Sequence, residues 1–274
     1  MKRPVSSIRL SVFFFWLVSH HSFGQGIVAS ALGLEGTAVA DGAALFQNPA
    51  MLAKQQFAEI SIQHYNHFRI GNWNDLSIFG STVTSPRSAF SAGYSLQGFP
   101  GFQTHILGIA SGMTCSKKIA VGIAGGIEMM RIGDALTQSS KSLMAKAGLT
   151  YSLSSLLQLG VVINNPHRWI TVNEDPESKS TEISAGISYE PSRNFTWYVE
   201  LNHDMVSGSC NSGIQYNPGE NIACRIGYNG ASKQISAGLG FLYKILCIDA
   251  AVLHHPFLGV STGISIRYSI ISRS

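Results

Sequence analysis

The stretch of sequence that decides the fold runs from Val260 to Ile270 and reads VSTGISIRYSI. Along it, apolar residues and Thr262 alternate with glycine, serine and one arginine, Arg267. Successive side chains of a β-strand point to opposite faces, so this alternation predicts a strand with one apolar face. The other face is expected to be small and polar.

The same alternation recurs upstream in runs of about ten residues, which is the length a tilted strand needs to cross a bilayer. Several of the runs end their apolar face with an aromatic residue. The clearest runs begin at Phe90, Ile183, Phe195 and Ile235. Counting from Phe57 to Ile271 gives about 14 strands, within a range of 12 to 16. We therefore predict an all-β fold, a transmembrane antiparallel β-barrel of about 14 strands formed by residues 57–274.

The connections between the predicted strands support a barrel, because outer-membrane barrels alternate short periplasmic turns with longer outer loops. The long connections are 66–74, 131–141 and 165–180, and the short ones are 85–87, 115–118, 153–155 and 190–193. With this alternation both termini fall on the periplasmic side. After Asn202 every connection is brief, so the last third of the chain does not test the pattern.

A secreted soluble β-sandwich would also show alternation, since one face of each strand packs on a core. Its outward face would carry many charged residues, yet only 12% of this chain is charged and the small face is mostly glycine and serine. These features favour the barrel and leave the sandwich as an alternative. A helical membrane protein is excluded, because beyond the N-terminus no uninterrupted apolar run approaches 20 residues.

The N-terminus predicts a cleavable secretory signal peptide, residues 1–24. Lys2, Arg3 and Arg9 precede the short apolar run Leu10–Val18, and small residues stand where a signal peptidase cleaves, after Gly24. Without this segment the chain has 16 basic and 15 acidic residues. No nucleic-acid partner is expected, because such proteins concentrate basic residues on one face.

The residues that could carry chemistry have no arrangement that predicts an enzyme, a cofactor or a metal site. The four cysteines, Cys115, Cys210, Cys224 and Cys247, have no metal-type spacing and could pair in three ways or remain small strand residues. Three short groups of polar residues are expected to be chance neighbours or solvated charges and not sites: His203 with Asp204 and Ser207, His254 with His255, and Glu174 with Asp175 and Glu177.

Residues 25–56 lack the strand pattern and are predicted to form an N-terminal hatch that fills the barrel lumen. The segment is rich in alanine and poor in charge. Asp41 is expected to cap a short helical turn that extends to Phe46, and an Asn-Pro pair is expected to cap a second turn with proline at its first position. The residues assigned to this hatch motif are Asp41, Asn48, Pro49, Ala50 and Leu52.

The same segment resembles the start of the FadL-like outer-membrane barrels, and within them the PorV/PorQ branch. The resemblance rests on Gly33, Gly36, the stretch Ala40–Ala43 and the stretch Asn48–Ala53, together with the ending Leu258–Tyr268. It covers about 35 residues at the two ends of the chain. It implies a 14-stranded outer-membrane barrel with a hatch in the lumen. The chain has Asp41-Gly42 where such hatches often have Asp-Asp.

The resemblance implies two functions of different kinds. Members similar to PorV and PorQ serve type IX secretion by binding secreted cargo proteins, whereas FadL-like members take up hydrophobic small molecules through the outer loops. The length of the chain and its N-terminal motif favour the secretion component, with the channel as the alternative. Either function could use the aromatic residues of the predicted outer loops, which are Phe68, Trp73, Phe99, Phe102 and Trp169.

Two arginines, Arg225 and Arg267, fall on the predicted lumen face. We expect them to anchor the hatch through Asp41 or Glu35. The remaining expected partners are other secretion components and the lipid of the outer membrane of a Gram-negative bacterium. A monomer is expected, because pairing of the first strand with the last removes the free edges of the sheet.

Overall fold

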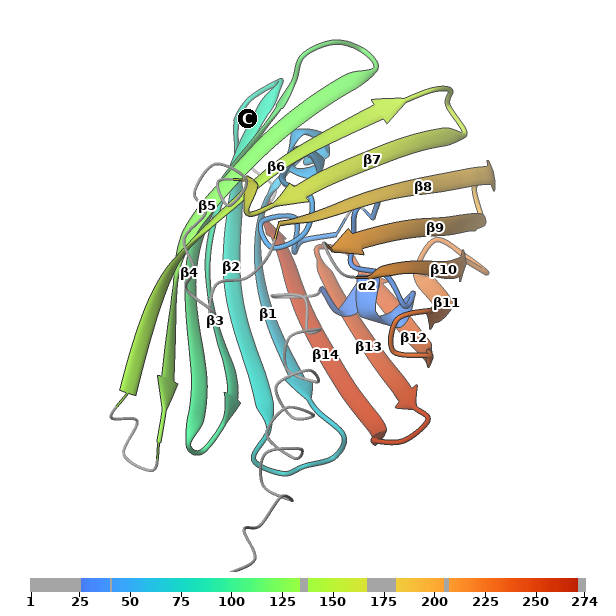
Figure 1. Ribbon diagram of the computed structural model, residues 1–274. Helices are drawn as coiled ribbons and strands as arrows, with labels where there is room; N and C mark the ends of the chain where they lie inside the picture. Colours follow the sequence, from blue (N-terminus) through green and yellow to red (C-terminus); the bar gives the residue numbers. More distant parts are fainter. Residues whose placement is uncertain (1–25, 40, 134–137, 167–180, 205–206, 271–274) are drawn as a thin grey trace, which may run out of the picture.

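The computed structural model describes residues 26–39, 41–133, 138–166, 181–204 and 207–270. Fourteen antiparallel strands form one closed barrel in which each strand pairs with its sequence neighbours and β1 pairs with β14 (Figure 1). The strands are β1 (Ala58–Asn66), β2 (Asn74–Ser85), β3 (Ser88–Phe99), β4 (Phe102–Thr114), β5 (Ile119–Ile132), β6 (Gln138–Ser152), β7 (Leu157–Asn164), β8 (Glu182–Ser192), β9 (Phe195–Asp204), β10 (Gly208–Tyr216), β11 (Ile222–Asn229), β12 (Gln234–Tyr243), β13 (Leu246–His255) and β14 (Gly259–Ile270). The predicted fold class and strand number are confirmed.

The two faces of the sheet divide as the alternation predicts. On β14, Ile264 and Ile266 are 45% and 47% exposed on the outside, whereas Ser261 and Ser265 are 1% and 5% exposed on the lumen side. The outer surface is a band of isoleucine, leucine, valine and aromatic side chains over most of the strands. This inverts the pattern of a soluble protein and is the surface of a barrel that faces lipid.

The two ends of the barrel differ in their connections. The longest connections, 67–73 and 165–181, join β1 to β2 and β7 to β8 at one end, which we call the loop end. The other connections at this end are shorter, at 100–101, 133–137, 205–207, 230–233 and 256–258. The opposite end, which we call the turn end, carries the connections 86–87, 115–118, 153–156, 193–194, 217–221 and 244–245. The strand lengths are also uneven: β4, β5 and β6 have 13 to 15 residues, whereas β7 and β11 have eight each.

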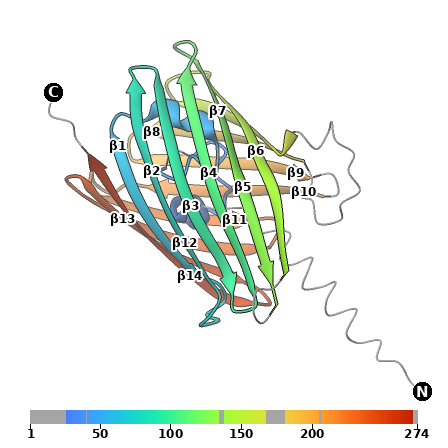
Figure 2. The ribbon, with the colours of Figure 1, turned by 90° about the vertical axis from the view of Figure 1, so that its left-hand side faces the viewer.

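The N-terminal segment lies inside the barrel and is enclosed by the strands (Figures 1 and 2). It begins with the short helix α2 (Ile27–Ala31), continues through a turn at residues 41–47 and ends with the 3-10 helix η1 (Pro49–Lys54). Its apolar side chains, including Leu32, Leu45 and Phe46, are almost completely buried. The predicted hatch is therefore present in the lumen, described from Gly26 onward.

All four cysteines are free, so none of the three possible pairings is formed. None of the described helices has the length and hydropathy needed to span a membrane. The predicted signal peptide lies outside the described residues.

Candidate functional site

Two residues of the hatch motif organise its turns through their side chains. The Asp41 Oδ1 atom accepts a hydrogen bond from the Ala43 N–H at 2.8 Å, and Asn48 Oδ1 accepts one from the Ala50 N–H at 3.0 Å. Pro49 occupies the first position of η1, where its missing N–H costs nothing. Both predicted caps are confirmed. Asn48, Pro49, Ala50 and Leu52 are all buried against the barrel wall.

The wall receives η1 on a row of three glycines on adjacent strands. Gly112 lies opposite Gly122, and Gly122 lies opposite Gly148, in the register of β4, β5 and β6. A Cβ atom at Gly112 would lie 2.6 Å from the Pro49 carbonyl oxygen, and one at Gly122 or Gly148 would overlap hatch atoms. The row therefore forms a groove that admits the backbone of the Asn48-Pro49 turn.

Two further glycine pairs repeat this arrangement around the lumen. Gly160 lies opposite Gly186 beneath Thr37, and Gly213 lies opposite Gly227 beneath Leu32. The lumen face, which the sequence predicts to carry small side chains, is thus the surface against which the hatch backbone packs.

Glu200 on β9 is the principal polar anchor of the hatch. Its carboxylate accepts the Glu35 N–H through Oε1 and the Thr37 N–H through Oε2, both at 2.8 Å, and its side chain is almost completely buried. The Asn202 amide also donates to Oε1, at 3.3 Å. One buried carboxylate therefore satisfies two backbone donors of an irregular segment, which would be costly to bury without partners.

Additional polar contacts hold the rest of the hatch. The Lys146 ammonium donates to the Phe46 carbonyl oxygen, Ser236 Oγ donates to the Ala31 carbonyl oxygen at 3.0 Å, and Asn229 donates to the Gly33 carbonyl oxygen at 3.3 Å. Neither Glu200 nor Lys146 was assigned from the sequence. The sequence pattern that could have identified them is a charged residue on the strand face that otherwise carries small side chains and points into the lumen.

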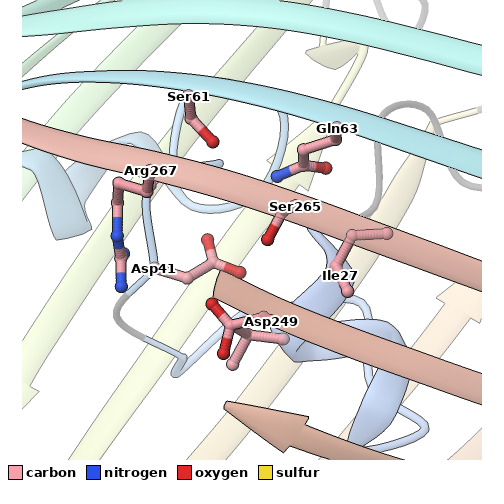
Figure 3. Close-up of a pocket in the computed structure, with 9 residues that line it drawn as sticks. Ile27, Asp41, Ser61, Gln63, Asp249, Ser265 and Arg267 are labelled. Atoms are coloured by element: carbon pink, nitrogen blue, oxygen red, sulfur yellow. The ribbon is translucent and has the colours of Figure 1, made fainter. Parts of the chain in front are cut away.

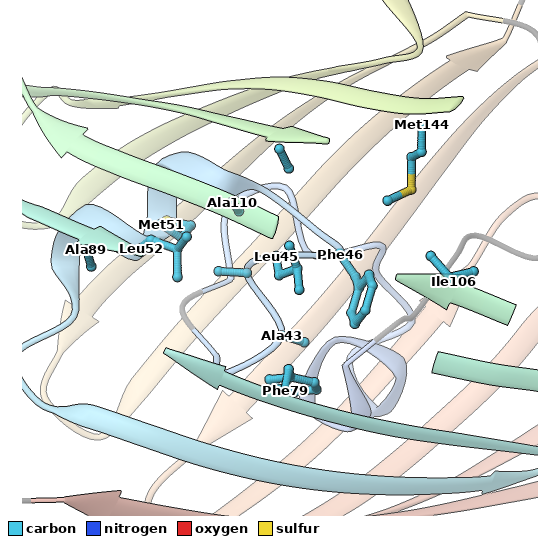
Figure 4. Close-up of a cluster of buried hydrophobic side chains, with 12 residues drawn as sticks. Ala43, Leu45, Phe46, Met51, Leu52, Phe79, Ala89, Ile106, Ala110 and Met144 are labelled. Carbon is cyan, nitrogen blue, oxygen red and sulfur yellow. The ribbon is translucent and has the colours of Figure 1, made fainter. Parts of the chain in front are cut away.

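The opposite side of the hatch makes an apolar contact with the wall (Figure 4). Phe46 packs edge-on against Phe79, with the ring centroids 6.1 Å apart. The cluster contains Ala43, Ala44, Leu45, Phe46, Met51 and Leu52 from the hatch and Phe79, Ala89, Ile106, Ala110, Ala124 and Met144 from β2 to β6. Every one of these side chains is buried.

A small polar cavity remains between the hatch and the wall of β1, β13 and β14 (Figure 3). Its volume is about 10 Å³, which is about the room needed by one water molecule. The lining residues are Ile27, Val28, Asp41, Gly42, Ser61, Gln63, Asp249, Ser265 and Arg267. Burial raises the pKa of the Asp41 carboxyl above its usual range, and the Ala43 N–H and the nearby Arg267 charge only partly oppose this.

One of the two lumen arginines lies beside an expected hatch carboxylate, and the other does not. Arg225 does not reach a hatch carboxylate: it forms an ion pair with Asp249 at 2.7 Å and donates to Gln215 at 2.8 Å, both in the wall. The pair crosses β12 over Gly240, where a Cβ atom would lie 2.5 Å from Asp249 Oδ1. Arg267 lines the cavity beside Asp41, and its hydrogen bond goes to Cys247 Sγ at 3.5 Å.

The aromatic residues predicted for the outer loops gather into one cluster at the loop end. Trp73 contacts Phe68 and Phe99, with ring centroids 5.8 and 5.6 Å apart, and Phe99 stacks on Phe102 at 5.8 Å. These separations are typical of favourable aromatic pairs. Trp169 lies outside the described residues. We call Phe68, Trp73, Phe99 and Phe102 the aromatic mouth.

His67 extends the aromatic mouth inward to Tyr65 of β1. The His67 ring lies 5.1 Å from Trp73 and 4.6 Å from Tyr65, and its Nε2 atom lies 2.8 Å from Asp75 Oδ2. Tyr65 packs against the buried cluster that includes Ile27 and Ala31 of α2. The rings therefore form a continuous path of contacts from the loop end to the hatch.

The loop that carries Phe68 has an unusual backbone. Phe68 and Arg69 have φ angles of 51° and 57°, in the left-handed region that non-glycine residues seldom adopt. The Phe68 N–H donates to Ser261 Oγ at 3.0 Å, which ties the loop to β14. Such strained positions persist only where surrounding contacts impose them, and they are frequent in ligand-binding segments.

Metal chemistry finds no support in the described part of the chain. Among residues 26–39, 41–133, 138–166, 181–204 and 207–270, no group of three or more His, Cys, Asp or Glu side chains is placed to hold a metal ion. The acidic cluster Glu174, Asp175 and Glu177 lies outside these ranges.

The sequence matches no protein-family model and no curated protein. Solved structures do share its fold. The toluene transporter TbuX of Ralstonia pickettii aligns with a TM-score of 0.73 and 11% identity, over 92% of this chain and 100% of its own. The toluene transporter TodX of Pseudomonas putida gives 0.70 and 9%, over 92% and 100%. A FadL homologue of Pseudomonas aeruginosa gives 0.61 and 11%, over 90% and 98%.

At these identities the likeness establishes the fold and nothing finer. The barrel with its lumenal hatch has the fold of the FadL-like outer-membrane barrels, as the resemblance of the N-terminal motif implies.

Proposed function

We propose that this protein is an outer-membrane channel for hydrophobic small molecules, which enter at the aromatic mouth and pass the hatch. The similar structures are described as toluene transporters and a FadL homologue, and this supports the channel over the secretion component favoured by the sequence. None of these comparisons concerns the PorV/PorQ branch or cargo proteins.

The observation that carries the proposal is the continuity between the aromatic mouth and the hatch. The rings of Phe102, Phe99 and Trp73 lead through His67 to Tyr65, and Tyr65 packs against the buried cluster that includes two residues of α2. Planar apolar molecules bind aromatic faces favourably. A ligand on these rings would therefore lie at the start of a path of contacts that ends at the hatch.

Our proposal places the barrel in the outer membrane of a Gram-negative bacterium as a monomer, exported by the signal peptide of residues 1–24. The lipid-facing apolar band and the closed strand order support this location, because only closed barrels can span a membrane with strands. The turn end then faces the periplasm and the loop end faces the outside. No catalytic role is proposed.

The proposal is tested by uptake of radiolabelled toluene into a Gram-negative host that lacks its own hydrocarbon channels. Expression of the protein should raise the initial rate several-fold, and Trp73→Ala should remove most of the increase. The matched control is Trp197→Ala, since Trp197 is 47% exposed on the lipid face.

Equal uptake with and without the protein, at matched amounts of heat-shifted barrel on gels, would contradict the channel. The secretion reading makes a different prediction, namely retention of secreted cargo proteins by the purified barrel with no uptake of toluene.

A further inference from the structure

The turn end of the barrel carries charge unevenly around its circumference. Three basic residues, Arg87, Lys117 and Lys118, stand on the adjacent turns after β2 and β4, and all three are exposed. We call these residues the basic rim. No acidic residue occurs in the surrounding stretches 81–90, 111–122 and 148–158. The neighbouring strand β1 carries Glu59 opposite Ser81, and this carboxylate accepts a hydrogen bond from Ser269 Oγ at 3.2 Å. Within the three stretches themselves the basic rim has no carboxylate to neutralise it.

The other side of the turn end is balanced. The turns after β8 and β12 carry Arg193 and Lys244, and the strand ends and turns nearby carry Glu190 and Glu220. Two basic residues thus face two acidic ones there. The Lys244 ammonium also lies 5.4 Å above the Tyr243 ring, which gives it a local partner.

Backbone hydrogen bonds hold the two basic turns beside each other. The Thr114 N–H donates to the Arg87 carbonyl oxygen at 2.7 Å, and the Ser152 N–H donates to the Lys118 carbonyl oxygen at 2.8 Å. Ser116 Oγ also accepts from the Lys118 and Ile119 N–H groups at 3.3 and 3.2 Å. The hairpins after β2 and β4 project side by side at one end of the barrel (Figure 2).

An apolar surface lies directly below the basic rim on the same strands. Met113 is 49% exposed and Ile123 is 69% exposed, and Phe90, Ile119 and Leu149 also face outward. Because these side chains belong to the lipid-facing alternation, they can contact acyl chains. Basic groups above an apolar wall match the two parts of one amphipathic molecule, an anionic headgroup and its chains.

We propose that the basic rim is a binding site for an anionic phospholipid of the periplasmic leaflet, whose phosphate contacts Arg87, Lys117 and Lys118. The acyl chains lie along the outer surface of β3 to β6. Clusters of basic residues at a membrane surface attract anionic lipids additively. The inference depends on the barrel's orientation and not on what it transports.

The test uses the purified full-length barrel in vesicles with equal parts of phosphatidylglycerol and phosphatidylcholine. Spin-labelled forms of each lipid report which lipid is immobilised at the protein surface. The wild type should prefer phosphatidylglycerol by about fivefold or more at low salt. The combined variant Arg87→Gln, Lys117→Gln and Lys118→Gln should show a preference close to unity.

The matched control is Arg193→Gln with Lys244→Gln, which also removes charge from the turn end and should keep the preference. A charge-preserving variant, Arg87→Lys with Lys117→Arg, should keep it as well. The heat-dependent gel shift verifies that every variant is a folded barrel.

Three results would overturn the proposal. The first is that the basic-rim variant keeps the full preference for phosphatidylglycerol. The second is that the control variant loses as much of this preference as the basic-rim variant does. Displacement of the lipid preference by inorganic phosphate, at an ionic strength where sodium chloride has no effect, would indicate a site for free phosphate. Toluene uptake is measured separately, so failure of the channel proposal leaves this test intact.

Discussion

The hatch is held by two contrasting sides of the same lumen. Against β2 to β6 it packs through an apolar cluster centred on Phe46 and Phe79. Against β9 to β12 a smaller apolar cluster, which Tyr198 contacts, is joined by hydrogen bonds, chiefly from the hatch N–H groups to Glu200 and from Ser236 to a hatch carbonyl oxygen. The side of β2 to β6 contributes one such bond, from Lys146. On both sides lumen-facing glycines let the hatch backbone approach the wall.

This contrast indicates which side of the lumen can release the hatch. Apolar packing is roughly proportional to buried area, so it weakens gradually as a segment shifts. A hydrogen bond has a narrow geometric range, and a buried donor that loses its acceptor is costly unless water reaches it. We therefore expect the apolar side to dominate stability and the polar side to control opening.

The largest effect is expected from Phe46→Ala on the apolar side. Removal of a buried phenylalanine typically costs about 3–5 kcal/mol, because it removes apolar burial and leaves a cavity. Denaturant unfolding in detergent micelles, monitored through protease protection of the hatch, measures this loss of stability. Phe241→Ala is the control, since Phe241 is exposed to lipid, and it should change little. Equal losses for both variants would show that the hatch contact is not what stabilises the lumen.

The next effect tests the glycine groove beneath η1. In Gly122→Ala the added Cβ would overlap the hatch backbone, and overpacking of this kind typically costs about 1–3 kcal/mol. We expect a value near the upper limit, because the atoms that the new Cβ would meet belong to the hatch backbone and cannot move aside by a change of side-chain rotamer. Gly219→Ala is the matched control, because a Cβ there meets no atom within 4 Å. Normal protection of the hatch in Gly122→Ala would refute the close approach.

A smaller loss of stability with a larger gain of opening is expected from Glu200→Gln. Glutamine keeps one carbonyl acceptor but loses the second, so one of the two hatch N–H groups loses its partner, at about 2 kcal/mol. Amide hydrogen exchange should therefore accelerate at Glu35 and Thr37 before it does in η1. Uniform acceleration throughout the hatch would contradict the division between the two sides.

The smallest effect is a pH dependence through Asp41. Burial raises the pKa of this carboxyl, while Ala43, Arg267 and Gln47 lower it and Asp249 raises it. The folded state therefore binds a proton more readily than the unfolded chain. Hatch stability should rise as pH falls toward the unfolded pKa, and should fall as pH increases through the raised folded pKa. Asp41→Asn should flatten this part of the profile in thermal unfolding, and an unchanged profile would refute the assignment.

The sequence predicts the barrel because strand alternation is local. Val260–Ile270 alone displays both faces of β14, and fourteen such runs gave the strand number. The hatch caps were also predictable, because Asp41 and Asn48 bond to residues only two positions away. Features of this kind need no knowledge of which strands are neighbours.

The anchors of the hatch could not be predicted, because they depend on register. Glu200 bonds to residues 165 and 163 positions away, and the row formed by Gly112, Gly122 and Gly148 exists only in the paired strands. Arg225 was placed on the lumen face, but its partner is Asp249 across Gly240, which pattern alone does not reveal. A resemblance of about 35 residues also could not distinguish the PorV/PorQ branch from other FadL-like barrels.

The anchored hatch should close the resting barrel to ions, and the conductance of the protein in a planar lipid bilayer measures this closure. The wild-type protein should show almost no ion current, whereas Glu200→Gln should show repeated brief openings. A steady, large conductance of the wild type, equal to that of Glu200→Gln, would contradict the account.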